Sequence, residues 1–228
     1  MIDVAVWDGL LRRHVDGEGR VDYAAWQRQG AGELEGWLAV QRPFDPDPGT
    51  GPEAFALWIN LYNALVIRQV LARFPLASIR PTVAGVPNWP AFLAFFSRPA
   101  LSLQGQPLSL DRIEHGILRP RFADPRLHFA LVCAARGCPL LRPEAYRPER
   151  IAAQLEEDAH RFLGNTLKLR FDPSRRTLHC SRILQWYRRD FLAAAPSIAA
   201  YVGRHRPDLD LPADVRIAWL PYDWALNG

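Results

Sequence analysis

The sequence predicts an α+β fold: a mainly helical single domain around a small, mostly antiparallel sheet. Apolar side chains recur at helical spacing in several long segments, whereas strand-like alternation is confined to short segments of the C-terminal half. Helices and strands are also segregated along the chain instead of alternating regularly. With 228 residues, 49% of them hydrophobic, the chain can bury one full core. We expect a single domain over 1–228, with an N-terminal helical flank (1–50) and a motif-bearing core (51–228).

The N-terminal half is expected to be helical. Residues 3–14 and 22–40 are predicted to form helices separated by the turn "VDGEGR". A loop dense in proline and glycine, 41–53, should precede a long helix over 54–74 that Pro75 ends. The segment that follows, up to about residue 103, is irregular and aromatic.

The predicted strands lie in the second half. Ser109 is a good N-cap for a helix formed by "LDRIEHGILR", and "LHFALVC" (127–133) has the continuous apolar pattern of a buried strand. A helix over 148–163 should follow, and then "LKLRFD" and "TLHCSRIL" should pair as a hairpin around "PSRR". "WYRRDFLAAAPSIAAYVGRH" is expected to be helical, and "VRIAWLPYDWALN" to form a last short strand. About four short strands are therefore expected.

Charge and composition argue against several classes of protein. The net charge is only +4, and the arginines alternate with acidic residues, so nucleic-acid binding is not expected. The longest apolar segment is interrupted by Asn60, Asn63, Arg68 and Gln69, so we expect no membrane span. The N-terminus lacks the pattern of a signal peptide. We expect a cytoplasmic protein, with an exported relative whose leader has been removed as the alternative.

The stretch "LHFALVCAARGCPLL" contains the most informative residues. In a regular strand, His128 and Cys133 would point to opposite faces and would be poor partners. "AARG" can turn the chain, and Pro139 could then open a helical turn with Cys138 at its cap. A helix N-terminus lowers the pKa of a thiol, and Arg136 would add to that effect. Cys138 is therefore the preferred reactive thiol, with Cys133 as a buried or resolving partner.

Other interpretations of the cysteines stay open. Both can be structural residues, or a dithiol redox pair, although such pairs favour Cys-x-x-Cys spacing. A zinc site of Cys133, Cys138 and one or two of His115 and His128 is chemically allowed. Cys180, in the predicted hairpin, is expected to be a packing residue.

Two further groups of polar residues are candidates for the site. Asn60 and Asn63 share one face of an apolar helix, where a buried amide must be hydrogen-bonded. They can tie that helix to the backbone of a neighbouring loop, or one can orient a histidine or donate to an oxyanion. Glu114 and Asp111 lie near His115 on the next helix, where a carboxylate can orient an imidazole. A surface Asp–His pair with a solvated glutamate is the alternative.

Taken together, the motifs resemble the DUF547 family, a domain of unknown function found in bacteria and eukaryotes. The resemblance rests on "LWINLYNALVI", "LSLDRIEHGILR", "RLHFALVCAARGCPLL…EAY", "WYRRDF" and "YDWALN", with "WDGLLRRHVDGEGRVDYAAW" similar to the N-terminal flank of bacterial members. One departure is Leu140, where the family pattern has a second proline after Cys-Pro. The resemblance implies a single α+β domain and no particular reaction. It groups seven residues in family motifs: Asn60, Asn63, Glu114, His115, His128, Cys133 and Cys138.

These observations favour a cysteine-dependent hydrolase or acyltransferase that acts on an amide or thioester bond of a small-molecule or peptide substrate. Cys138 is the expected nucleophile, and His115 the general base, with His128 second. Glu114 or Asp111 would orient that base, and one of the two helical asparagines would stabilise charge. The alternative is a non-catalytic ligand- or protein-binding domain with a buried Asn/His/Cys network and an aromatic groove around Trp89 and "WLPYDW". A structural zinc site is the third hypothesis. The favoured reaction needs no cofactor and no metal.

Overall fold

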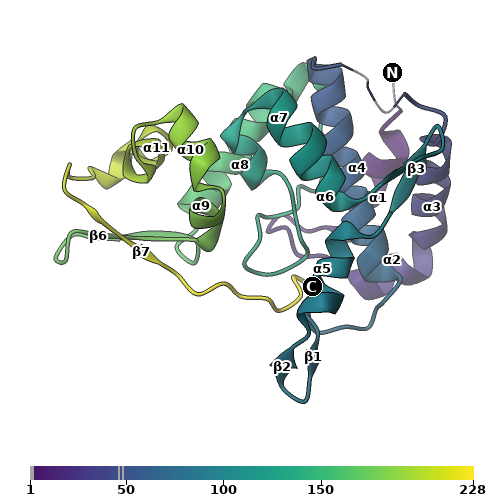
Figure 1. Ribbon diagram of the computed structural model, residues 1–228, viewed down its shortest axis with the longest axis horizontal. Coiled ribbons are helices and arrows are strands. Elements are labelled where there is room, and N and C mark those ends of the chain that lie inside the picture. The colour runs from purple at the N-terminus through teal and green to yellow at the C-terminus, as the bar shows by residue number, and fades with distance from the viewer. Residues whose placement is uncertain (1–2, 46, 48) are drawn as a thin grey trace.

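The computed structural model describes residues 3–45, 47 and 49–228, and it confirms a mainly helical α+β fold with small sheets (Figure 1). Met1 and Ile2 of the predicted flank, and Pro46 and Pro48 of the predicted loop, lie outside the described residues. The described residues form two hydrophobic clusters, a larger one in the N-terminal helical body and a smaller one around the C-terminal helices and sheet.

The N-terminal flank contains three helices: α1 (Ala5–His14), α2 (Tyr23–Gln29) and α3 (Ala31–Val40). The single helix predicted over 22–40 is broken at Gly30. A Cβ atom at this position would lie 2.8 Å from the Leu10 side chain and 3.0 Å from those of His14 and Trp26. Glycine therefore allows the junction of α2 and α3 to pack directly against α1.

The long helix α4 (Pro52–Leu71) is the centre of the larger cluster, and it ends four residues before Pro75. By length and composition it is the one described helix that could cross a membrane, yet 89% of its most apolar window is buried inside this fold. Packing against α2, α3 and α6 (Leu110–Ile113) explains its apolar character.

The segment after α4, which was expected to be irregular, contains regular elements. Two short antiparallel hairpins, β1 (Thr82–Val83) with β2 (Val86–Pro87) and β3 (Leu101–Leu103) with β4 (Gln106–Leu108), flank α5 (Trp89–Ser97).

Ser109 is confirmed as the N-cap of α6, because its hydroxyl accepts a hydrogen bond from the backbone N–H of Arg112 at 3.1 Å. The predicted continuous helix is interrupted, however. A π-helical turn, η1 (Glu114–Leu118), separates α6 from α7 (Arg119–Phe122). Such turns are rare and occur often at functional sites.

The strand predicted for "LHFALVC" is wrong. Residues Pro125–Phe129 form a 3₁₀ helix, η2, and irregular backbone follows it. Asp124 caps this turn by accepting from the N–H of Arg126, and Pro125 suits the first helical position. The argument from strand alternation, which separated His128 from Cys133, therefore does not apply.

The remaining elements agree better with prediction. A 3₁₀ turn, η3 (Pro148–Arg150), leads into α8 (Ile151–Gly164). The predicted hairpin is confirmed as β5 (Leu169–Asp172) and β6 (Thr177–Cys180) in antiparallel register, and β7 (Arg216–Trp219) adds to β6 in parallel. The helical segment between them comprises α9 (Arg182–Trp186), α10 (Arg188–Ala194), α11 (Ile198–His205) and the 3₁₀ turn η4 (Pro207–Leu209).

After β7 the chain returns to the helical body, as the yellow segment in Figure 1 shows. Backbone hydrogen bonds fix it there: Leu226 N–H donates to Ala77 C=O at 2.9 Å, and Asn227 N–H donates to Ala134 C=O at 3.0 Å. The returning segment therefore lies against the loop that carries both predicted cysteines.

Candidate functional site

A cavity of about 500 Å³ lies among α4, α5, η1, α9, the 128–138 segment and the returning C-terminal segment; we call it the cysteine pocket. Six of the eight predicted catalytic residues line it: Asp111, Glu114, His115, His128, Cys133 and Cys138. A larger cavity of about 680 Å³, at the start of α4, has no cysteine or histidine in its lining. Two of the three cysteines and two of the six histidines thus line the smaller cavity.

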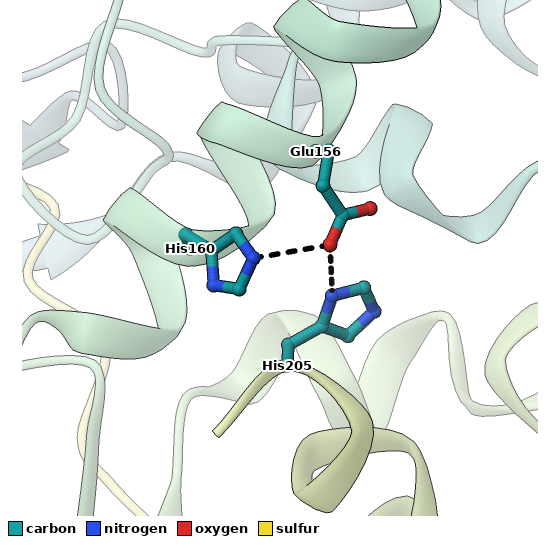
Figure 2. Close-up of side chains that lie close together, drawn as sticks. All are labelled: Glu156, His160 and His205. Atoms are coloured by element: carbon teal, nitrogen blue, oxygen red, sulfur yellow. Dashed lines mark hydrogen bonds and ion pairs between the residues drawn. The ribbon is translucent and has the colours of Figure 1, made fainter. Parts of the chain in front are cut away.

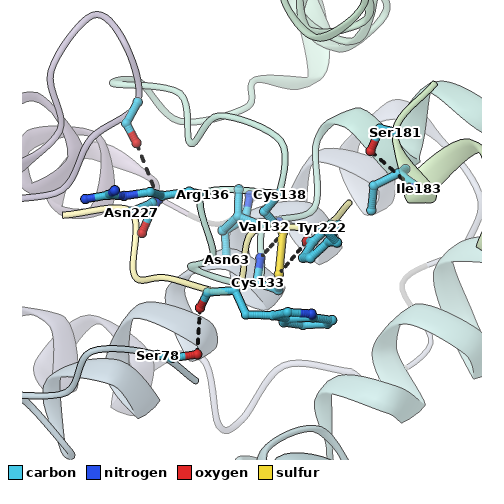
Figure 3. Close-up of a disulfide and its surroundings, with 12 residues drawn as sticks. Asn63, Ser78, Val132, Cys133, Arg136, Cys138, Ser181, Ile183, Tyr222 and Asn227 are labelled. Carbon is cyan, nitrogen blue, oxygen red and sulfur yellow. Dashed lines mark hydrogen bonds between the residues drawn. A yellow bond between two sulfur atoms is a disulfide. The ribbon is translucent and has the colours of Figure 1, made fainter. Parts of the chain in front are cut away.

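Cys133 and Cys138 are joined by a disulfide, with their Cα atoms 6.0 Å apart (Figure 3). The Cys138 Sγ accepts a hydrogen bond from the backbone N–H of Cys133 at 2.8 Å. The Cys133 Sγ lies 3.2 Å from the hydroxyl of Tyr222 on the returning segment. Cys133 is half-buried, whereas Cys138 is 3% exposed, so Cys133 is the more accessible of the two.

The predicted helix cap at Cys138 is wrong, because the next helical turn begins only at Pro148. The Arg136 side chain lines a different hollow, and its carbonyl oxygen accepts a hydrogen bond from the Lys168 ammonium group. No helix terminus therefore acts on Cys138, and the backbone N–H of Cys133 is the hydrogen-bond donor to its sulfur. Cys180 is fully buried in the smaller cluster, where burial raises the pKa of its thiol to about 12.

Asn60 and Asn63 both tie α4 to the backbone of a loop. Asn63 donates to Ala130 C=O at 3.0 Å and accepts from Val132 N–H at 3.1 Å. Asn60 makes the same pair of bonds to Tyr146, at 2.8 and 3.0 Å. These contacts match the structural alternative, and neither side chain lines the cysteine pocket. Asn63 holds the backbone immediately before Cys133.

Glu114 is buried on one side of the cysteine pocket, where it accepts a hydrogen bond from the Tyr62 hydroxyl at 3.1 Å. Burial and the Glu114 carboxylate raise the pKa of Tyr62 and of Tyr187. The Glu114 Oε1 lies 3.9 Å from the Nδ1 of His115, which is beyond hydrogen-bond distance. Glu114 therefore does not orient the His115 ring through a hydrogen bond.

Arg119 decides the tautomer of His115. Its Nη1 lies 3.1 Å from the His115 Nδ1, and a guanidinium group can only donate. In neutral His115 the proton must then be on Nε2. Asp111 also lines the cysteine pocket, where burial raises the pKa of its carboxyl group.

His128 has the partner that His115 lacks. Its Nε2 lies 2.7 Å from the Oδ2 of Asp190, and Arg119 binds both oxygens of that carboxylate at 2.7 and 2.9 Å. The Tyr187 ring stacks on the imidazole at a centroid distance of 3.8 Å. Because a carboxylate can only accept, neutral His128 carries its proton on Nε2 and presents an unprotonated Nδ1.

The pKa values of this pair favour one charge state. Burial lowers the pKa of His128, although the hydrogen bond with Asp190 opposes the effect. The pKa of Asp190 is lowered to about 2, chiefly by the Arg119 hydrogen bond. Neutral His128 beside ionised Asp190 is thus the expected state at neutral pH. Sequence reasoning missed Asp190 and Arg119, although both lie in quoted motifs, because they are 71 residues apart.

Aromatic side chains make up much of the wall of the cysteine pocket, and two of them, Trp89 and Trp186, are exposed. This aromatic rim comprises Trp89, Phe92, Trp186, Tyr222 and Trp224. Tyr222 and Trp224 lie 4.5 Å apart between ring centroids, and Trp89 is 52% exposed. The rim includes Trp89 and two residues of "WLPYDW", the segments that the sequence suggested for a ligand groove.

The described residues contain a separate group of possible metal ligands: Glu156, His160 and His205, whose ligand atoms all lie within 4.8 Å of one another (Figure 2). None of them lines the cysteine pocket. The two sulfurs that a zinc site in that pocket would use are bonded to each other in this structure.

Comparison with known proteins identifies a family. The model described as "Protein of unknown function, DUF547" matches residues 49–163, just over half of the chain. No curated protein and no solved structure matches. The matched range contains Cys133, Cys138 and all of η1, but it ends before Asp190 and Tyr222. The chain belongs to the DUF547 family.

Proposed function

We propose that this protein is a thiol-dependent hydrolase or acyltransferase that acts on an amide or thioester bond and is active when the Cys133–Cys138 disulfide is reduced. The observation that carries the proposal is the shared cavity. Two sulfurs, two imidazoles and a buried carboxylate line one pocket of about 500 Å³ behind an aromatic rim. Nucleophilic acyl transfer needs such a convergence of thiol and base.

Cys138 is the proposed nucleophile. The backbone N–H of Cys133 donates to its sulfur, and a donor of this kind stabilises a thiolate relative to a thiol. The thiolate attacks the acyl carbon, the bond to the amine or thiol leaving group breaks, and a thioester to Cys138 forms. Water or an acceptor then releases the acyl group and regenerates the thiol. Cys133 is the resolving thiol, which closes the disulfide by exchange with an external disulfide that is reduced to two thiols.

His128 replaces His115 as the proposed general base. Its Nδ1 is free of a proton in the expected neutral state, and Asp190 can stabilise the imidazolium that forms when it takes the thiol proton. His115 carries its proton on Nε2, so it suits donation to the leaving group or to a developing oxyanion. In the described part of the disulfide form, no hydrogen bond joins either sulfur to a histidine. Reduction frees both side chains to rotate about their Cα–Cβ bonds.

A second function, thiol–disulfide exchange, is favoured by one specific observation. The half-buried Cys133 presents a bonded sulfur to the cysteine pocket, where an incoming thiolate could attack it. Cys138 would then leave as a thiolate that already accepts the Cys133 N–H. A non-catalytic pocket that binds ligands through the aromatic rim is the remaining alternative.

These functions can be separated with one set of variants. The reduced protein is incubated with a panel of small acyl thioesters and anilides, and intact mass and peptide mapping identify any acyl adduct. We expect the adduct on Cys138, its loss in Cys138→Ser, and no change in the matched control Cys180→Ser. His128→Gln should slow acylation by about 10²–10⁴-fold.

Three results would count against the acyl-transfer proposal. One such result is that no acyl adduct forms with any member of the panel, while small thiols form mixed disulfides faster with the native protein than with a denatured control. That result would favour thiol–disulfide exchange. Saturable ligand binding without any chemistry would favour the binding domain. Acylation that persists in Cys138→Ser would move the nucleophile elsewhere.

A further inference from the structure

Helices α8 and α11 bring two histidines and one carboxylate together at a surface outside the cysteine pocket (Figure 2). Glu156 and His160 are four residues apart on α8 and therefore share a face, and His205 is the last residue of α11. The Glu156 Oε1 lies 2.8 Å from the Nδ1 of His205 and 3.2 Å from the Nε2 of His160. One oxygen thus faces one nitrogen of each imidazole.

This spacing suits a metal ion. Donor atoms at about 2.0–2.1 Å from a tetrahedral zinc ion lie about 3.3 Å from each other. The two separations from the Glu156 oxygen are within about half an ångström of that value, and the two imidazole nitrogens lie within 4.8 Å of each other, so modest shifts of flexible side chains would admit the ion. Imidazole nitrogens with one carboxylate oxygen form a donor set that favours zinc, copper or nickel over calcium or magnesium.

Neighbouring charged side chains fix the position of the Glu156 carboxylate. Arg126 binds the other oxygen of Glu156 at 3.0 Å and leaves Oε1 to the imidazoles. Asp124 pairs with Arg126 at 2.7 Å and offsets its positive charge. Ligating carboxylates are commonly fixed by such outer hydrogen bonds.

We propose that Glu156, His160 and His205 form a binding site for a divalent transition-metal ion, with zinc as the preferred ion. The ion would join α8 to α11, which pack together in the smaller cluster. His160 is the most exposed of the three, with 53% of its side chain accessible, so a fourth position is open to water or to another ligand. The site is independent of the thiol chemistry proposed above.

The test uses the full chain without a polyhistidine tag, treated with a chelator and titrated with Zn²⁺ by calorimetry. Wild type should bind one zinc ion at this site. His160→Ala, His205→Ala and Glu156→Gln should each weaken binding at least about 100-fold, because loss of an outer-layer partner alone costs 10–100-fold. His179→Ala, a histidine of β6 outside the cluster, is the matched control and should bind as wild type does. Mg²⁺ should not bind.

A second measurement guards against misfolded variants. Zn²⁺ should raise the Tm of wild type and of His179→Ala in a concentration-dependent way, and should leave the Tm of His160→Ala unchanged. Because His160 is exposed, its variant should have the wild-type Tm in chelator. Zinc binding that survives His160→Ala and disappears in Cys133→Ser/Cys138→Ser would place the ion on the pocket thiols and overturn the proposal, as would wild type that binds no zinc.

Discussion

The asparagine that holds the cysteine loop offers a quantitative test of the site's construction. Asn63 is 1% exposed, and its side chain satisfies both the Ala130 C=O and the Val132 N–H. Asn63→Ala removes both bonds and leaves the two backbone groups buried without that partner. The same change at Asn60 removes two equivalent bonds to Tyr146, which lies outside the Cys133–Cys138 loop, and a third bond that the Trp7 Nε1 donates at 3.2 Å.

The expected loss follows from the two unpaired groups. Each buried donor or acceptor left without a partner costs about 1–3 kcal/mol, so Asn63→Ala should lower the free energy of unfolding by about 2–6 kcal/mol. For a chain of this size, each kcal/mol corresponds to a decrease in Tm of about 2–4 °C. Asn63→Asp keeps the acceptor for Val132 but loses the donor to Ala130, and it also adds a buried charge. It should therefore be destabilising as well.

Urea unfolding followed by tryptophan fluorescence measures the loss, and the rate at which a small thiol reduces the disulfide reports on the loop. Asn63→Ala should be destabilised and should also be reduced faster below the unfolding transition. Asn60→Ala should lose at least as much stability, because it also leaves the Trp7 Nε1–H without this partner, but without that local acceleration. If Asn63→Ala unfolds within about 0.5 kcal/mol of wild type, a change typical of neutral surface substitutions, the structural role assigned to Asn63 is wrong.

Three further outcomes are expected. Arg142→Met leaves the buried Asp158 without its 2.9 Å ion pair and should cost about 3–5 kcal/mol in urea unfolding, with part of the loss recovered when Asp158→Leu is added. The pKa of Asp190 is about 2 in the folded chain against 3.8 ordinarily, so its contribution to stability is complete above about pH 4 and is lost as the pH falls toward 2. Asp190→Asn should weaken the dependence of the unfolding free energy on pH over that range. An unchanged dependence would contradict the lowered pKa assigned to Asp190. Iodoacetamide should label no cysteine of the native oxidised protein and two cysteines after reduction. Cys180 should stay unlabelled because it is buried and its thiol has a pKa of about 12. Peptide mapping that finds Cys180 labelled would refute its assigned burial.

Local signals in the sequence explain what could be predicted. Ser109 caps its helix through its own hydroxyl, and the β5–β6 hairpin depends on residues only a few positions apart. The apolar segment 127–133 misled prediction because continuous burial does not distinguish a strand from a 3₁₀ turn. There, the Asp124 cap and the Asn63 side chain determine the backbone.

The site itself combines residues that the sequence does not connect. Predicting that Glu114, His115 and both cysteines share a region was within reach, since each lies in a short motif. The partner of His128 is Asp190, 62 residues later, and His205 joins Glu156 across 49 residues. Tyr222 reaches Cys133 only because the C-terminal segment returns across the helical body. Such pairs follow from tertiary packing and not from spacing along the chain.

The central claim is that a thiol of the cysteine pocket is activated by histidine once the disulfide is open. The most direct measurement is the rate of iodoacetamide alkylation of Cys138 in the reduced protein, followed by mass spectrometry from pH 5 to 10. We predict a midpoint at least about one pH unit below the ordinary thiol value of 8.5, shifted upward in His128→Gln. A midpoint at or above about 8.5 in the wild type would contradict it.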